Sequence, residues 1–195
     1  MPGARADSES RRRQILDAAL HVAARRGLDQ LTVRQVAAQA GLSSGLVFFH
    51  FHSKDELLLG LLDDLLAWLV AGQAGGRATR PPTTFRELIC SEVAANRADK
   101  ERTETLLQFW VLGLQNPSMR RRIRAAVRAY QDLFLQAARQ VLAVRSKGRA
   151  VISPASLAGL GMALVLGSEV ASLLDPKWFD EWDPTAPLDA LLRGS

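Results

Sequence analysis

Two helix-start signals close together in residues 31–54 constrain the fold more than any other feature of the sequence. Thr32 suits the N-cap of a helix in which Gln35 can bond back to the cap residue. Gly41 can end that helix in a left-handed conformation, and Ser43 can cap a second helix almost immediately. The segment therefore predicts two short helices joined by about three residues, which is a helix-turn-helix.

The remaining sequence predicts helices throughout. An apolar stripe indicates a first helix from about Ser10 to Arg26, after a polar and mobile arm of residues 1–9. Capping signals and apolar stripes then predict helices over residues 44–51, 54–70, 85 to a break near 99, 102–115, 117–141 and 154–174. No segment alternates apolar and polar residues convincingly, so the predicted fold is all-α.

Composition limits the class of protein. The 195 residues are 48% hydrophobic, which is enough for a buried core. The single cysteine, Cys90, cannot form an internal disulfide, and no leader segment is recognisable, so we expect a cytoplasmic protein. The net charge of +5 favours a polyanionic partner such as nucleic acid.

Three runs of residues carry a family resemblance: Thr-x-Arg-x-x-Ala from Thr32, AGLSSGLVFFHF over 40–51, and SKDEL over 53–57. They resemble the DNA-binding domain of the tetracycline-repressor (TetR) family of bacterial regulators over roughly residues 10–60. The resemblance implies a three-helix DNA-binding domain in residues 1–54 and a helical ligand-binding and dimerisation domain in residues 55–195. The order of the later helices is similar to the choline-responsive, BetI-like branch, although no ligand is inferred from it.

The resemblance also implies which residues touch double-stranded DNA. Arg34 can bond guanine, Ser44 is a permissive hydrogen-bonding residue, and Leu46 can meet a thymine methyl group. The predicted contacts to phosphate groups are made by Thr32, His50 and Lys54. The full predicted set is Thr32, Arg34, Ser43, Ser44, Gly45, Leu46, Phe48, Phe49, His50 and Lys54. The alternative is that Ser44 and Gly45 only build the turn.

The sequence departs from the family pattern at two neighbouring positions. Phe48 and Phe49 stand where the family commonly carries polar aromatic residues, so a phenolic contact to phosphate is missing. Two interpretations remain open here. The rings pack against sugars and thymine methyl groups, or Phe48 faces the protein core.

A small-molecule effector is implied by the resemblance, with a cavity behind the DNA-binding domain. The predicted lining consists of Trp68, Cys90, Val93, Phe109, Trp110, Tyr130 and Phe134. The alternative for each residue is an ordinary place in the core, because aromatic side chains at helical spacing are more often core. The identity of the effector is not readable from the sequence.

Residues 155–168 are uncharged and rich in small side chains. The run is too short for a membrane span and continues into Glu169, so no membrane partner is expected. The family pairs its last two long helices with those of a second subunit, which predicts a homodimer; a buried monomer core is the alternative.

Three other interpretations concern parts of the sequence. His50 and His52 could suggest a metal site, but their rings diverge at a helix end, so no metal or cofactor is predicted. An all-α enzyme would need a nucleophile and a base in reach, and none is apparent. A membrane-surface protein could use the basic run Arg120 to Arg128. We expect this run instead to form a solvated face that pairs with an acidic tail around Asp180. The sequence thus predicts a ligand-responsive transcriptional regulator, most simply a repressor released from a palindromic operator by its effector.

Overall fold

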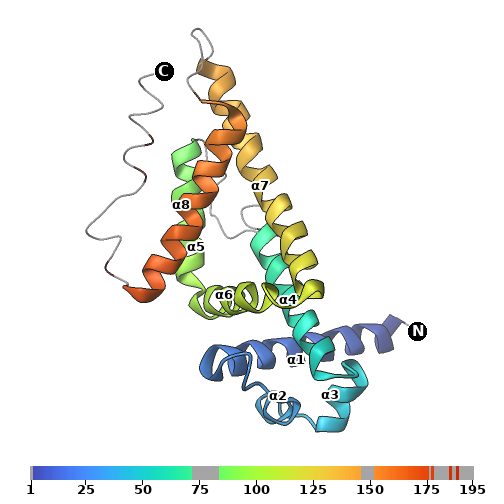
Figure 1. Cartoon of the computed structure of the whole chain (residues 1–195). Helices are drawn as coiled ribbons and strands as arrows, with labels where there is room; N and C mark the ends of the chain where they lie inside the picture. Colours follow the sequence, from blue (N-terminus) through green and yellow to red (C-terminus); the bar gives the residue numbers. More distant parts are fainter. Residues whose placement is uncertain are drawn as a thin grey trace. The chain divides into compact units, whose positions relative to one another are not determined.

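A computed structural model describes residues 2–71, 84–145, 152–175, 177, 185 and 188, and the helices follow one another along these residues (Figure 1). They are α1 Pro2–Arg26, α2 Val33–Ala40, α3 Ser44–His50, α4 Lys54–Ala71, α5 Phe85–Ala98, α6 Lys100–Gly113, α7 Pro117–Arg145 and α8 Pro154–Leu174. No strand occurs in the described ranges, and the predicted all-α fold is confirmed.

The first helix begins earlier than the sequence analysis predicted. α1 starts at Pro2, so residues 2–9 of the expected polar arm are helical instead. Proline is well suited to the first position of a helix, and Ala4 and Ala6 are strong helix formers. The polar character of this segment indicated exposure, and exposure does not prevent helix formation.

The predicted helix starts are confirmed by their hydrogen bonds. The hydroxyl of Thr84 accepts from the Glu87 amide at 3.1 Å, and that of Ser153 accepts from the Ser156 amide at 3.0 Å. Asn116 Oδ1 accepts from the amides of residues 118 and 119 at 3.0 and 3.2 Å, which opens α7. Each side chain satisfies backbone donors that a helix start would otherwise leave exposed.

The chain forms two compact units. Unit 1 comprises residues 1–68 and 101–123, and unit 2 comprises residues 69–100 and 124–195. Unit 1 therefore contains α1 to α3, most of α4, nearly all of α6 and the start of α7. Its core includes fully buried leucines of α4 together with Phe109 of α6. The predicted functional division at residue 54 stays a prediction.

In unit 2, α5 packs along α8. Phe85 and Phe134 meet edge to face with ring centroids 6.3 Å apart, and Tyr130 lies 5.1 Å from Phe134 in the same manner. A Cβ atom built on Gly161 would lie 2.7 Å from the Phe85 ring, so glycine is required where α8 crosses these rings. Aromatic packing and this close approach hold the core of unit 2 together.

Polar groups also enter that core. The Tyr130 hydroxyl donates to Glu92 Oε2 at 2.8 Å, and the Asn96 amide donates to Glu169. α8 has the length and apolar composition of a membrane span, but 33% of its apolar window is buried inside the molecule and its Glu169 is buried. A core helix of a helical bundle meets the same requirements of length and composition.

Candidate nucleic-acid interface

The helix-turn-helix forms as its sequence predicts. Thr32 Oγ1 accepts from the Gln35 amide at 3.3 Å, and the Gln35 side chain accepts from the Thr32 amide at 2.9 Å, completing the capping box. Gly41 adopts φ 65° and ψ 30° after α2, and Ser43 then caps α3 through the Leu46 amide at 3.2 Å. These local bonds set the turn between the two helices.

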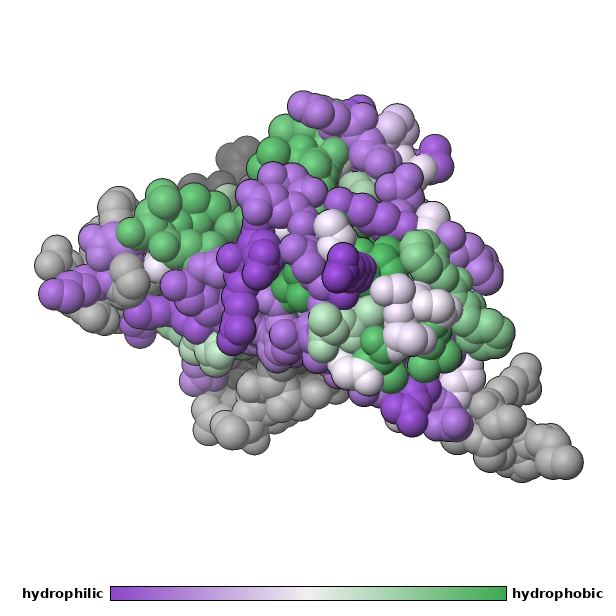
Figure 2. Space-filling model, turned by 90° about the horizontal axis from the view of Figure 1, so that it is seen from below, coloured by the Kyte–Doolittle hydropathy of each residue, from purple (hydrophilic) through white to green (hydrophobic). Residues whose placement is uncertain are grey.

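α3 has one face turned into the protein. Val47 and the following Phe51 are fully buried, and they anchor the helix against the rest of unit 1. The predicted DNA contacts lie toward the solvent side: Gly45, Phe48 and Phe49 are exposed, while Ser44, Leu46 and His50 are half-buried. The surface seen from below, where α2 and α3 lie, carries hydrophobic patches among hydrophilic ones (Figure 2).

Phe48 does not face the core. Its exposed fraction is 46%, and that of Phe49 is 73%, so the alternative that placed Phe48 in the interior was wrong. The Phe49 ring stands edge to face with His50, with centroids 5.3 Å apart and an interplanar angle of 88°. α3 therefore presents two apolar rings to solvent.

The other predicted contacts surround α3. Thr32, Ser43 and Arg34 are exposed. Lys54 is half-buried, and its ammonium donates to the Asp29 carbonyl at 3.2 Å. The geometry brings the ten predicted DNA-contact residues onto α2, α3 and the segments that flank them, although their individual roles at DNA stay predictions.

One cation of the first helix turns inward. The Arg12 guanidinium lies 4.5 Å over the Phe51 ring, and a Cβ atom built on Gly60 would lie 2.8 Å from that same ring. Arg12 thus joins α1 to the end of α3 through a cation–π contact, and its guanidinium lies near Gly60 of α4. This contact was not predicted from the sequence, because Arg12 and Phe51 lie far apart in the chain.

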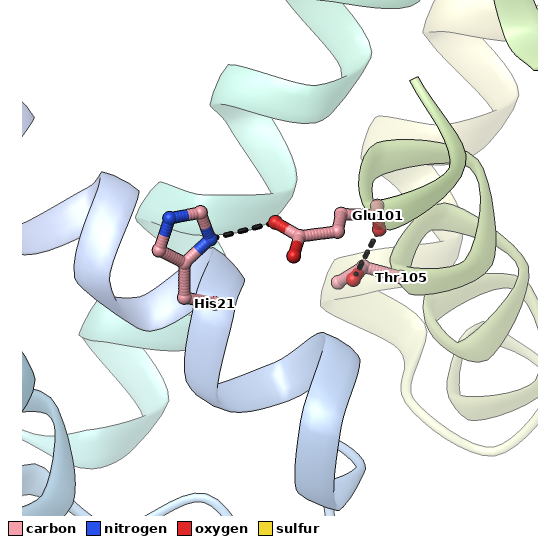
Figure 3. Close-up of polar contacts among 3 residues, drawn as sticks. All are labelled: His21, Glu101 and Thr105. Carbon is pink, nitrogen blue, oxygen red and sulfur yellow. Dashed lines mark hydrogen bonds and ion pairs between the residues drawn. The ribbon is translucent and has the colours of Figure 1, made fainter. Parts of the chain in front are cut away.

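The attachment of α6 to α1 was not predicted from the sequence. His21 Nδ1 lies 2.6 Å from Glu101 Oε2, and the Glu101 carbonyl accepts from the Thr105 hydroxyl at 2.7 Å (Figure 3). Gln108 Oε1 accepts from the Leu28 amide at 2.9 Å just after α1. Two side chains of α6 therefore hold the DNA-binding helices within unit 1.

Two arginines at the basic start of α7 bond to other parts of the protein. Arg120 Nε donates to the Gly113 carbonyl at 2.9 Å at the end of α6, and Arg122 pairs with Asp63 of α4. These bonds favour a structural role for part of the run. The acidic tail around Asp180, Glu181 and Asp183 lies outside the described residues, so the predicted pairing with it stays a prediction.

The seven predicted effector contacts divide between the two units. Trp68, Phe109 and Trp110 belong to unit 1, and the other four, Cys90, Val93, Tyr130 and Phe134, belong to unit 2. Within unit 2, Val93, Tyr130 and Phe134 are buried, whereas Cys90 is exposed and its sulfur lies 3.7 Å from the Thr185 hydroxyl. The cavity that these residues were expected to line stays a prediction.

Taken together, a capped helix-turn-helix with an exposed second helix defines a DNA-binding protein of the helix-turn-helix class. Residues 15–61 match the family described as bacterial regulatory proteins, tetR family. The chain is 30% identical over 164 residues to the HTH-type transcriptional regulator BetI of Brucella anthropi, covering 82% of this chain and 84% of that protein. The chain belongs to the TetR family of transcriptional regulators and is similar to its BetI-like branch.

Solved structures agree on the fold. A crystal structure described as a transcriptional regulator from Pseudomonas aeruginosa PAO1 superposes with a TM-score of 0.75 at 22% identity, covering 95% of this chain and 90% of the other. A regulator from Saccharomonospora viridis in complex with choline gives a TM-score of 0.68 at 21% identity, with coverages of 95% and 93%. These structures show the fold, and the family assignment makes the protein a DNA-binding transcriptional regulator.

Proposed function

We propose that this protein is a cytoplasmic repressor that binds a palindromic operator as a homodimer and is released by a small-molecule effector. The observation that carries the proposal is the exposed face of α3 beside the exposed Arg34 of α2. A recognition helix in the major groove reads base edges with the residues that it presents to solvent. Because α3 spans only Ser44–His50, one copy can make few base contacts, and a symmetric pair doubles them.

The surface of α8 supports the dimer. Its buried residues recur on one side, at Leu157, Gly161, Val165 and Ser168. Beyond its first turn, its exposed residues are Ala163, Gly167, Val170 and Leu174, which recur at spacings of three and four on another side, and none of them is polar. An exposed apolar stripe on a long helix is best covered by a second copy of the same helix across a two-fold axis.

A charged substitution in this apolar stripe tests the dimer. Val170→Glu places a carboxylate in the stripe, and we expect monomers in sedimentation experiments together with loss of operator binding. Ala94→Glu is the matched control, because Ala94 is an exposed residue of α5 outside the stripe. A Val170→Glu protein that remains dimeric would contradict the assignment of this face.

α6 supports the proposed response to the effector. Because Glu101 and Gln108 tie α6 to α1 and to Leu28, any effector that favours another position of α6 displaces the DNA-binding helices as well. The response is a shift between two populations whose recognition helices have different spacings, of which only one fits successive major grooves. Choline is the first compound to test, because the similar regulator from Saccharomonospora viridis was solved with it.

The decisive experiment measures binding of the purified protein to DNA flanking its own gene. We expect a protected palindrome that survives excess competitor DNA at several salt concentrations, and release of that DNA by the effector. Binding that disappears with competitor and moderate salt would refute sequence-specific recognition at this site, because non-specific binding is mainly electrostatic and falls steeply with salt.

A further inference from the structure

The exposed phenylalanines of α3 are not explained by the folded chain. The core contacts of this helix are made by Val47 and Phe51, whose exposed fractions are 0% and 1%. Phe48 and Phe49 contribute little to the core and leave two apolar rings in water on a helix of only seven residues. Large apolar side chains that the fold leaves exposed beside polar groups mark a binding surface.

The surroundings of these rings match duplex DNA as the partner. Arg34 is exposed on α2 and Lys54 lies after α3, so cationic groups lie on both sides of the rings in sequence. Gly45 precedes Phe48 and Phe49 by three and four residues, which places it one helical turn away on the same side. A Cβ atom built there would meet only Ser43 Oγ, at 3.9 Å, so the helix is bare beside the rings and can approach a groove closely.

The chemistry of phenylalanine then restricts what the rings can recognise. A phenyl ring offers no hydrogen-bond donor, so it cannot replace a tyrosine hydroxyl at a phosphate oxygen. The C5-methyl group of thymine is the apolar group that bases present in the major groove of DNA. The edge-to-face contact with His50 favours one orientation of the Phe49 ring, which reduces the entropy lost on binding.

We propose that Phe49, with Phe48 beside it, determines specificity by packing against thymine methyl groups in each half of the operator. This proposal rests on the proposed DNA-binding function and names the feature of the operator that is read. At these positions an apolar contact to a base takes the place of the phenolic hydrogen bond to phosphate that the family pattern implies. It makes this part of the interface independent of salt and dependent on base identity.

The test removes methyl groups from the DNA without changing any base pair. Duplexes that bind the full-length protein are first selected from a random pool, and each fixed thymine is then replaced singly by deoxyuridine. We expect about fourfold weaker binding for each methyl group that a phenyl ring covers, since burying one such group contributes about 0.8 kcal/mol. The dependence of affinity on salt concentration should be the same for both duplexes, because no phosphate contact is lost.

Variants assign the effect to the ring. Phe49→Ala should lose the preference for thymine over deoxyuridine at the positions that the Phe49 ring covers, whereas Phe49→Leu should retain part of it because it keeps an apolar contact. Folding is checked by thermal unfolding, which should not change, since Phe49 is 73% exposed. The same comparison with Phe48→Ala assigns the share of the second ring.

The outcomes separate this inference from the function beneath it. Sequence-specific binding with equal affinity for thymine and deoxyuridine duplexes overturns the methyl contact and leaves the repressor standing. An unchanged preference in both Phe49→Ala and Phe48→Ala also overturns it, because the methyl group would then be read by another residue. Failure to select any duplex overturns both proposals.

Discussion

Gly60→Ala should destabilise unit 1 by crowding the contact between α4 and the end of α3. A Cβ atom at residue 60 lies 2.8 Å from Phe51 Cε1, about 0.6 Å inside ordinary van der Waals contact, and 3.4 Å from the Arg12 guanidinium. The Phe51 ring is 1% exposed and Arg12 lies over its face, so the ring cannot move away at little cost.

The expected size follows from two opposing effects. Overpacking of a core site costs about 1–3 kcal/mol. Replacing glycine by alanine inside a helix contributes about 1 kcal/mol in the other direction. We therefore expect a net loss of about 1 kcal/mol in the free energy of unfolding, or a fall of about 2–4 °C in Tm for a chain of this size.

The assay is thermal and denaturant unfolding at one fixed protein concentration, because self-association would otherwise shift Tm. Gly45→Ala is the matched control, since its added methyl group meets only Ser43 Oγ at 3.9 Å and should not lower stability. Operator affinity of Gly60→Ala should also fall, because Phe51 ends α3. A Gly60→Ala protein as stable as the wild type would refute the argument that Phe51 and Arg12 are tightly held.

Three further predictions concern single side chains. Arg34→Ala should relax sequence preference, while Lys54→Ala should weaken binding to every duplex and reduce the salt slope by about 1; equal losses on all sequences from both variants would contradict these roles. Thr32→Ala should cost about 1 kcal/mol of stability through the lost cap, and Thr32→Ser should restore most of it in urea titrations. Gln108→Ala should lower the unfolding free energy by about 1–3 kcal/mol, since it removes the acceptor of the buried Leu28 amide, and unchanged stability would show that water replaces it.

The sequence predicted the features of this fold that depend on neighbours in the chain. A cap such as Thr32 or Ser153 acts on amides two or three residues away, so a short segment contains all the information needed. The same locality made the helix-turn-helix predictable, whereas the exposure of Phe48 was left open between two interpretations. The beginning of α1 was missed because polarity reports exposure, while helix formation depends on backbone preference.

Features that depend on distant parts of the chain could not be read in this way. Arg12 and Phe51 are separated by 39 positions, and nothing in the run Arg11 to Arg13 distinguishes the cation that packs on a ring. His21 and Glu101 are 80 positions apart and half-exposed, so neither carries a signal of its partner. Such pairs follow from tertiary packing, which one sequence does not specify.

The attachment of α6 to the DNA-binding helices bears on the construction of hybrid regulators. A chimera that exchanges only residues 1–54 would separate Glu101 and Gln108 from their partners in α1 and at Leu28. It would leave a foreign surface at the contact on which the proposed effector response depends. A graft that also carries residues 55–68 and 101–123 transfers the whole contact. The natural unit of exchange in this protein is therefore discontinuous in sequence, and hybrids cut at a single position should bind DNA yet respond poorly to their effector.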